Sequence, residues 1–269
     1  MEKNPRMAAG AQPAARLEGH LVVGGVSHDL DFVRLELLKL AADIPQLRLA
    51  VHADFEPLGD LDPSCALLTY TCDVRPSARA EAALERFVKD GGRWLALHAT
   101  NAHLAWSAAG VASEHADTPF FRTLGSAFVA HPPLDGRTFR VDVETPMHPL
   151  VSGIPAFEVE DELYLTEEFG PLEVLLSTRF SGGTPGFVVD SWADDIRRPI
   201  MYLKHTGIGA VLYLNLGHAR GHYDAPHRTP FYPKVERGAW VTPEYQELLR
   251  RSVRWVTRLP PFAVSEIPQ

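Results

Sequence analysis

The sequence predicts an α/β protein in which a mainly parallel central sheet is covered by helices on both faces. In the first hundred residues, short apolar segments alternate with segments whose apolar residues recur at helical spacing. The apolar segments are almost continuously hydrophobic, which is typical of parallel strands buried on both faces. This β-α-β rhythm indicates a doubly wound, three-layer architecture.

The N-terminal half supplies the elements of this unit. The predicted strands are residues 20–26, 47–54, 64–71 and 93–99. The predicted helices are residues 29–44 and 77–92. Ser27 or Asp29 could cap the first helix, and Gly91 and Gly92 end the second.

After Ala109 the pattern changes to segments that alternate apolar and polar residues between turn signals such as SGGTPG, which predicts antiparallel or mixed strands. These segments are residues 138–144, 157–165, 173–180, 186–192 and 199–205. A buried strand at 210–217 and an amphipathic helix at 242–259 close the fold. The sequence therefore predicts one domain with a β-rich insertion.

The ends of the chain are predicted to lie outside this domain. Residues 1–19 are low in β-branched and aromatic residues, so we expect a flexible N-terminal tail. The single domain then covers residues 20–260, and residues 261–269 form a C-terminal tail.

Composition excludes several classes of protein. The net charge is −8 and no stripe of Lys and Arg occurs, which argues against a nucleic-acid-binding face. Two cysteines, Cys65 and Cys72, flank one apolar run and do not form a disulfide framework of the secreted type. The first 18 residues lack an apolar signal core, and no stretch is long enough to span a bilayer. We therefore expect a cytoplasmic protein without a membrane or nucleic-acid partner.

Polar residues follow three of the predicted parallel strands. Ligands of open parallel sheets bind beyond the carboxyl ends of the strands. Candidates at these ends are His28 after the first strand, Thr71 after the third, and His98 and Asn101 after the fourth. A single buried histidine is more often satisfied by backbone groups, and this alternative stays open for each one.

The number of histidines nevertheless favours a shared pocket, because the chain has 12, several beside Pro or Gly in predicted loops. The second half adds further candidates: His131, His148, Asp161, Glu162, Tyr164, His218, His222, Asp224 and His227.

Known catalytic motifs are largely absent. His218 and His222 have the spacing of zinc-protease ligands, but the glutamate between them is missing, and Gly217 and Gly221 favour a loop. A divalent metal remains possible; it would take three nitrogen or carboxylate ligands and a water, with Glu162 as the carboxylate. No G-x-S-x-G or Walker-type motif occurs, and Cys72 is expected to be a small buried residue.

A series of motifs in one order resembles the ThuA-like, or trehalose-utilisation, family. They are GGRWLALHATNAH, AFVAHPP, MHPLVSGI, EDELY, RPIMYLKHTGIGAVLYLNLGH and LLRRSVRWV. The resemblance runs from the first strand to the last helix and implies a flavodoxin-like fold similar to that of class I glutamine amidotransferases. Those enzymes present a cysteine nucleophile where this chain has His98, so glutaminase activity is not expected.

The resemblance also implies site residues, namely His28, His98, His131, His148, Asp161, Glu162 and His218. Two departures leave the substrate open: the segment after L-G-H is longer and richer in histidine, and Tyr202 stands where the family usually has tryptophan. Family members are associated with disaccharide and keto-sugar metabolism.

Two hypotheses follow. In the first, the protein is a sugar-directed hydrolase, lyase or isomerase in which His98 and His218 react together with Glu162, by proton abstraction next to a carbonyl or by hydrolysis. The expected substrate-binding residues are His28, Thr71, Asn101, His131, Asp161, Tyr164 and His222. Aromatic candidates for stacking on a sugar are Trp106, Tyr164, Trp192 and Tyr223. In the second, the protein binds a carbohydrate without catalysis. A homo-oligomer is possible under either.

Overall fold

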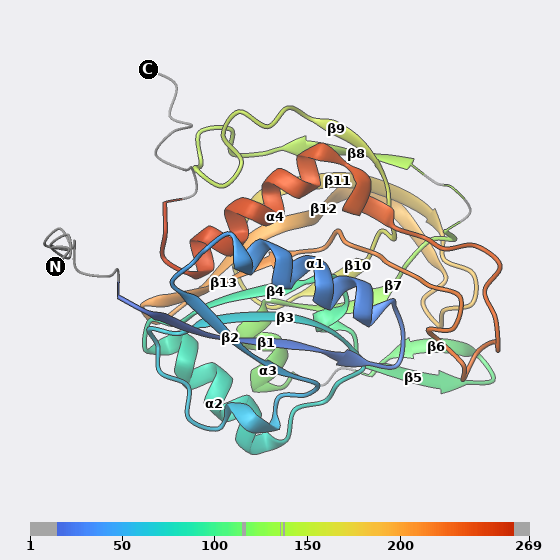
Figure 1. The fold of residues 1–269 in the computed structure, drawn as a ribbon. Helices are drawn as coiled ribbons and strands as arrows, with labels where there is room; N and C mark the ends of the chain where they lie inside the picture. Colours follow the sequence, from blue (N-terminus) through green and yellow to red (C-terminus); the bar gives the residue numbers. More distant parts are fainter. Residues whose placement is uncertain (1–14, 115–116, 135, 137, 261–269) are drawn as a thin grey trace, which may run out of the picture.

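The computed structural model describes residues 15–114, 117–134, 136 and 138–260, and within them a nine-stranded mixed sheet forms the centre of the molecule (Figure 1). Its order is β2 (Leu47–His52), β1 (Leu17–Gly25), β3 (Ala66–Cys72), β4 (Arg93–Leu97), β13 (Gly209–Leu214), β12 (Ser191–Thr206), β11 (Glu173–Gly183), β8 (Thr138–Val143) and β9 (Phe157–Glu160). The first five are parallel and the remaining pairings are antiparallel. The α/β class with a large central sheet is confirmed, and the predicted β-rich insertion contributes strands to this same sheet.

Helices cover both faces of the parallel part (Figure 1). Helices α1 (Leu30–Ala42) and α4 (Pro243–Val256) lie on one face, and α2 (Ala78–Lys89) and α3 (Pro119–Leu124) on the other. Successive side chains of a strand point to opposite faces. In β1, Leu21 accordingly packs with the core under α1, and Val22 with the core under α2.

Short polar contacts set the starts of two helices, and the first of them is one of the two caps that the sequence offered. The Asp29 carboxylate accepts the backbone N–H of Phe32 at 3.1 Å and so caps α1. The Ser77 hydroxyl accepts the N–H of Ala80 at 3.3 Å and caps α2 in the same way. At the other end of α2, Gly91 has a φ of 108°, a left-handed conformation that glycine adopts without strain.

Several predicted boundaries were wrong. Strand β1 begins at Leu17, so residues 17–19 belong to the sheet and not to the tail, while residues 1–14 and 261–269 of the predicted tails lie outside the described residues. Residues 186–190 form a turn and not a strand, because the Thr184 hydroxyl donates to the carbonyl of Val189 at 2.6 Å and closes the chain on itself.

Several short elements were not predicted. Among them are α3 and the strands β5 (Leu104–Ser107), β6 (Gly110–Ser113) and β7 (Ser126–Ala130). Strands β5 and β6 form one hairpin, and β7 pairs with β10 (Leu165–Glu168).

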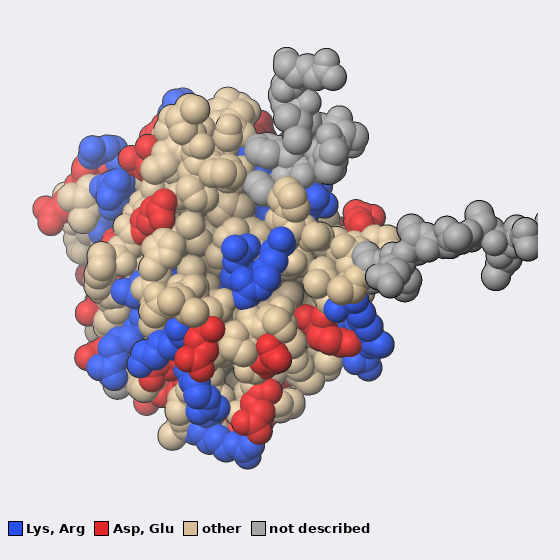
Figure 2. All heavy atoms as spheres, turned by 90° about the vertical axis from the view of Figure 1, so that its left-hand side faces the viewer, with Lys and Arg blue, Asp and Glu red and all other residues tan. Residues whose placement is uncertain are grey.

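The charges on the surface are mixed. Figure 2 shows one face of the molecule, on which Lys and Arg side chains lie among Asp and Glu side chains, and uncharged residues make up much of the visible area. Separately, none of the helices in the described ranges has the length and apolar character that crossing a bilayer requires.

The parallel strands place their carboxyl ends at one edge of the sheet. Strand β4 pairs in parallel with β13, so Leu97 and Leu214 are neighbours. The strand order reverses between β1 and β3, and such a reversal is where open α/β sheets bind ligands. The segments that follow β1, β4 and β13 therefore meet at this edge.

Candidate functional site

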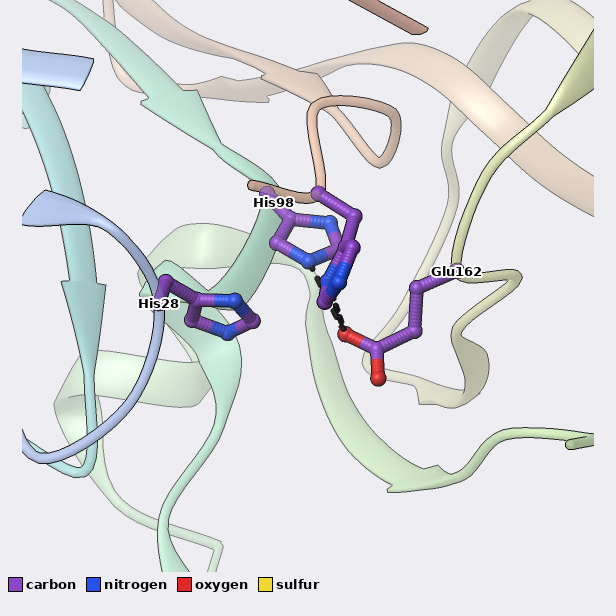
Figure 3. Close-up of side chains that lie close together, drawn as sticks. His28, His98 and Glu162 are labelled. Atoms are coloured by element: carbon purple, nitrogen blue, oxygen red, sulfur yellow. Dashed lines mark hydrogen bonds and ion pairs between the residues drawn. The ribbon is translucent and has the colours of Figure 1, made fainter. Parts of the chain in front are cut away.

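Three histidines and a glutamate meet at the carboxyl edge of the sheet. His98 directly follows β4, His28 comes three residues after β1, and His218 comes four residues after β13. Glu162 lies between β9 and β10 and enters from the antiparallel side. One nitrogen of each ring and one oxygen of Glu162 lie within 4.8 Å of one another, and these four residues could hold a metal ion. Figure 3 shows the rings of His28 and His98 on one side of the Glu162 carboxylate.

The Glu162 carboxylate contacts an imidazole nitrogen with each of its oxygens. Oε2 is 3.2 Å from Nε2 of His98 and 3.0 Å from Nδ1 of His218. Oε1 is 3.1 Å from Nε2 of His131. Glu162 is only 3% exposed, so these contacts replace water around a buried carboxylate.

Backbone carbonyls orient two of these rings. Nδ1 of His98 donates to the carbonyl of Asn215 at 2.7 Å, and Nδ1 of His131 donates to the carbonyl of Pro132 at 2.8 Å. Each ring therefore turns its Nε2 toward Glu162.

Carboxylates hold the third ring and its loop. Nε2 of His218 is 2.9 Å from Oε2 of Glu236, on the side away from Glu162. Asp161 accepts the backbone N–H groups of Gly217 at 2.6 Å and of His218 at 2.9 Å. Asp161 thus fixes the loop that carries His218, and its role is to position that ring.

The remaining ring, His28, is buried and incompletely paired. Its Nε2 is 3.3 Å from the hydroxyl of Tyr164, whereas its Nδ1 is buried without a hydrogen-bond partner among the described residues. His28 and His98 both have left-handed backbone conformations, with φ of 77° and 43°. Such conformations are strained for residues other than glycine and often occur at functional sites.

Burial and neighbouring charges shift the pKa values in opposite directions. Burial alone would raise the pKa of Glu162, but the neighbouring histidine rings hold it well below its usual range. Burial would lower the pKa of His218, yet the carboxylates of Glu162 and Glu236 raise it to about 9. Burial, and next the ring of His98, hold the pKa of His28 well below its usual value. The cluster therefore pairs an ionised carboxylate with a neutral His28.

A pocket opens beside Glu162. Its lining includes His28, His131, Glu162, Tyr164, three further aromatic side chains (Trp106, Phe128 and Phe187) and two arginines (Arg220 and Arg228). Among the described residues of this lining, Glu162 is the sole carboxylate. His98 and His218 are absent from the described lining, so they lie behind the carboxylate and not in front of it.

Other sequence-predicted residues lie elsewhere. Thr71 is buried, and its backbone N–H is 3.4 Å from the Thr100 hydroxyl. The Asn101 amide donates to the Ser126 hydroxyl at 2.8 Å in the interior. His222 is half-buried, and its ring stacks on Phe231. Since these three are absent from the described pocket lining, their positions do not favour direct contact with a substrate.

Three further candidates lie away from the cluster, whereas a fourth, Cys72, lines the pocket. Nδ1 of His148 accepts the N–H of Leu150 within a turn. Trp192 donates to Thr184 at the base of the β11–β12 turn, and Tyr223 is 70% exposed. Cys72 is buried, and burial raises the pKa of its thiol to about 12, which does not suit a nucleophile.

Sequence reasoning missed several residues of the site. Glu236 comes 18 residues after His218 in an irregular segment and carries no motif. Phe187 reaches the pocket from the β11–β12 turn. The arginines, Arg220 and Arg228, stand in the histidine-rich segment and could have been noted there as positive charges beside a predicted pocket.

Comparisons with known proteins agree with this architecture. A family model described as "ThuA: Trehalose utilisation" matches residues 66–231, which is more than half of the chain. A ThuA-like protein from Bacteroides uniformis is similar in structure, with a TM-score of 0.62, 19% sequence identity, and coverage of 95% of this chain and 98% of that chain. A second, from Parabacteroides merdae, has a TM-score of 0.57 and 15% identity, and covers 93% of each chain. At these identities the likeness shows the fold alone. No curated protein matches the sequence.

Proposed function

Because the chain belongs to the ThuA family, whose description is trehalose utilisation, we propose that it is an enzyme of carbohydrate metabolism that acts on a keto-sugar in the pocket beside Glu162. The observation that carries the proposal is a buried, ionised carboxylate that faces a pocket and contacts imidazoles with both of its oxygens. Aromatic side chains suited to the faces of a sugar ring, Trp106 and Tyr164, line the same pocket.

The lining favours proton abstraction next to a carbonyl over direct hydrolysis. Glycoside hydrolysis generally uses two carboxylates that flank the scissile bond. Among the described lining residues, Glu162 has no carboxylate partner facing the pocket. A keto-sugar needs only one base, since its carbonyl makes the neighbouring C–H group acidic.

The reacting groups are Glu162 and His131. Oε1 of Glu162 and Nε2 of His131 are 3.1 Å apart, and both residues line the pocket. This pair takes the proton from the carbon and holds it between oxygen and nitrogen, while the electron pair of the C–H bond moves to the carbonyl oxygen. The guanidinium of Arg220, also in the lining, stabilises the enolate that forms. His98, His218 and Asp161 position Glu162 and do not touch the substrate.

The strand order supports the finer fold assignment that we also propose, a flavodoxin-like and amidotransferase-like sheet. The five parallel strands lie in the order β2-β1-β3-β4-β13, which corresponds to the 2-1-3-4-5 order of flavodoxin-like sheets.

The test is turnover of defined sugars by the full chain. We expect the wild type to convert at least one member of a panel of disaccharides and their keto derivatives, trehalose included. Glu162→Gln should lower kcat/KM by about 100-fold or more, because it removes a general base but keeps the shape of the side chain. His222→Ala, outside the pocket lining, serves as the matched control and should retain activity.

Full turnover by Glu162→Gln would contradict the proposal. Saturable sugar binding without any product would also overturn it and would favour a non-catalytic carbohydrate-binding protein.

A further inference from the structure

The contact between His98 and Glu162 leaves two acceptors face to face. The carbonyl of Asn215 can only accept a hydrogen bond, so Nδ1 of His98 carries the hydrogen. A neutral ring then has a lone pair at Nε2, and this lone pair points at Oε2 of Glu162 from 3.2 Å. Two acceptors at this distance repel unless a proton or a cation lies between them.

The same conflict recurs at His131, and His218 avoids it at both of its nitrogens only as an imidazolium. Nδ1 of His131 donates to the carbonyl of Pro132, so its Nε2 also meets Glu162 as an acceptor. Both nitrogens of His218 face carboxylate oxygens, one of Glu162 and one of Glu236. A proton on Glu162 could satisfy only one of its three contacts. Protons alone would therefore require several buried imidazolium ions side by side, which is costly.

A divalent cation resolves the conflicts at His98 and His218 with neutral rings. Imidazole nitrogens and a carboxylate oxygen are the ligands that Zn²⁺ and similar first-row ions take in proteins. Two such atoms, each about 2.1 Å from one ion, lie about 3.0–3.4 Å apart at tetrahedral or octahedral angles. The separations of Oε2 of Glu162 from His98 and His218, 3.2 and 3.0 Å, fall in this range.

Groups around the cluster have the arrangement of a second coordination shell. Metal-bound histidines generally donate their other ring N–H to a carbonyl or carboxylate, which fixes the tautomer and the ring plane. Asn215 does so for His98, and Glu236 does so for His218.

His28 supplies the fourth ligand group. It is 4% exposed, its Nδ1 has no hydrogen-bond partner in the described part of the chain, and its strained backbone holds the ring at the cluster. It also lines the pocket, so the cluster borders the space where a substrate would bind.

From these contacts we propose that the protein binds one divalent first-row metal ion, of the Zn²⁺ type, through His28, His98, Glu162 and His218. The inference deepens the proposed function, and the use of the ion in the reaction rests on that function. The bound ion would add positive charge at the floor of the pocket. Metal binding is measured apart from turnover, so either proposal can fail alone.

A second pair of histidines lies outside the cluster, and its own metal binding needs a control variant. Nδ1 of His20 and Nε2 of His52 are 3.0 Å apart on the neighbouring strands β1 and β2, and neither residue belongs to the cluster. Among the described residues, neither histidine belongs to a group of three or more possible metal ligands, so we expect this pair to bind metal weakly at most. His52→Ala removes the pair and leaves the cluster intact.

The experiment measures metal content and affinity of the full chain. Protein stripped with a chelator is titrated with Zn²⁺ and with Co²⁺, and bound metal is counted by elemental analysis after gel filtration. We expect one ion per chain in the wild type and in His52→Ala, visible absorption bands for the Co²⁺ form, and a higher Tm on adding metal. Glu162→Gln and His98→Ala should lose stoichiometric binding. Glu236→Gln, which keeps all four ligands, should weaken it by about 10- to 100-fold.

The controls separate the possible outcomes. If His98→Ala does not fold, as judged by circular dichroism, Glu236→Gln and Glu162→Gln still test the site. Absence of stoichiometric metal in the folded wild type after titration would overturn the metal proposal, as would loss of the ion in His52→Ala. A wild type that turns over sugar but takes up no metal on titration would refute the metal proposal and leave the proposed function. A protein that binds the metal but turns over no sugar would refute the proposed function and leave the metal proposal.

Discussion

His103 immediately precedes β5, and its ring is stacked on Phe120 at a centroid distance of 5.3 Å. Burial, and next the positive charge of Arg75, lower the pKa of His103 to about 4, against the smaller effects of the carboxylates of Asp73 and Glu114. The native protein therefore holds this ring neutral at pH values where the unfolded chain protonates it.

The lowered pKa of His103 makes stability depend on pH. The unfolded chain binds a proton at His103 below pH 6.5, whereas the native state binds it only near pH 4. The stability that the neutral ring contributes is therefore complete above pH 6.5 and is lost as the pH falls toward 4. The loss should reach up to about 3 kcal/mol in the free energy of unfolding. Urea unfolding at pH 7 and pH 4.5 should show a smaller loss for His103→Gln, which still donates to the carbonyl of Val74. Equal losses in both proteins would refute this pKa.

The same residue type thus serves different purposes, and the sequence alone could not separate them. His103 packs against aromatic rings, and His148 accepts a backbone N–H in a turn. His98 and His218 contact one carboxylate. Nothing in the local sequence around His148 distinguishes it from a site residue, because its separation from the cluster follows from the antiparallel half of the fold.

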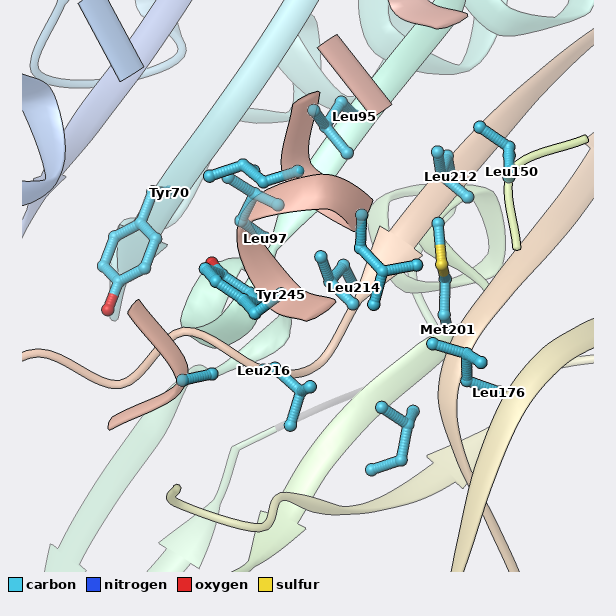
Figure 4. Packing of buried hydrophobic residues seen from close by; sticks show 14 of the residues in the cluster. Tyr70, Leu95, Leu97, Leu150, Leu176, Met201, Leu212, Leu214, Leu216 and Tyr245 are labelled. Atoms are coloured by element: carbon cyan, nitrogen blue, oxygen red, sulfur yellow. The ribbon is translucent and has the colours of Figure 1, made fainter. Parts of the chain in front are cut away.

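At the scale of elements, predictability followed length and periodicity. Helix α4 has a strongly amphipathic sequence, and its Tyr245 packs among leucines of β4 and β13, such as Leu97 and Leu214 (Figure 4). Elements of this kind were predicted. Strands β5, β6 and β7 and helix α3 have four to six residues, too few to show a period, and were missed. Strand β4 is as short, with five residues, but was predicted because it is almost entirely apolar and follows two glycines.

Strand β1 depends on a glycine at its close approach to a neighbouring loop. A Cβ atom on Gly24 would lie 1.9 Å from the carbonyl oxygen of Ala53, so the backbone would have to move. Gly24→Ala should lower the free energy of unfolding by about 1–3 kcal/mol. Gly183→Ala, also in a strand but with its nearest contact at 3.7 Å, is the matched control and should change it by less than about 0.5 kcal/mol. Chemical denaturation of both variants measures the difference, and equal stabilities would contradict the packing described here.

At the scale of the whole molecule, topology assembles the site. His98 and His218 are far apart in the chain, but they follow parallel neighbours, β4 and β13, and so leave the sheet at one edge. This much of the site follows from strand ends, as it does for His28. Glu162 comes from the antiparallel half, which strand-end reasoning does not place; the sequence offered it as a candidate carboxylate, and the family resemblance included it. Neither strand ends nor the family resemblance could predict Glu236, since its contact with His218 depends on the path of an irregular loop.

Hydrogen exchange on carbon tests most directly whether Glu162 serves proton abstraction. The wild type is incubated in D₂O with the keto-sugar that it converts best, and substrate and product are followed by proton NMR. We predict that the signal of the C–H group next to the carbonyl disappears in the presence of the wild type and persists with Glu162→Gln, since the carboxylate is the pocket's base. Product that forms in D₂O without deuterium at that carbon, or equal exchange with Glu162→Gln, would contradict the account.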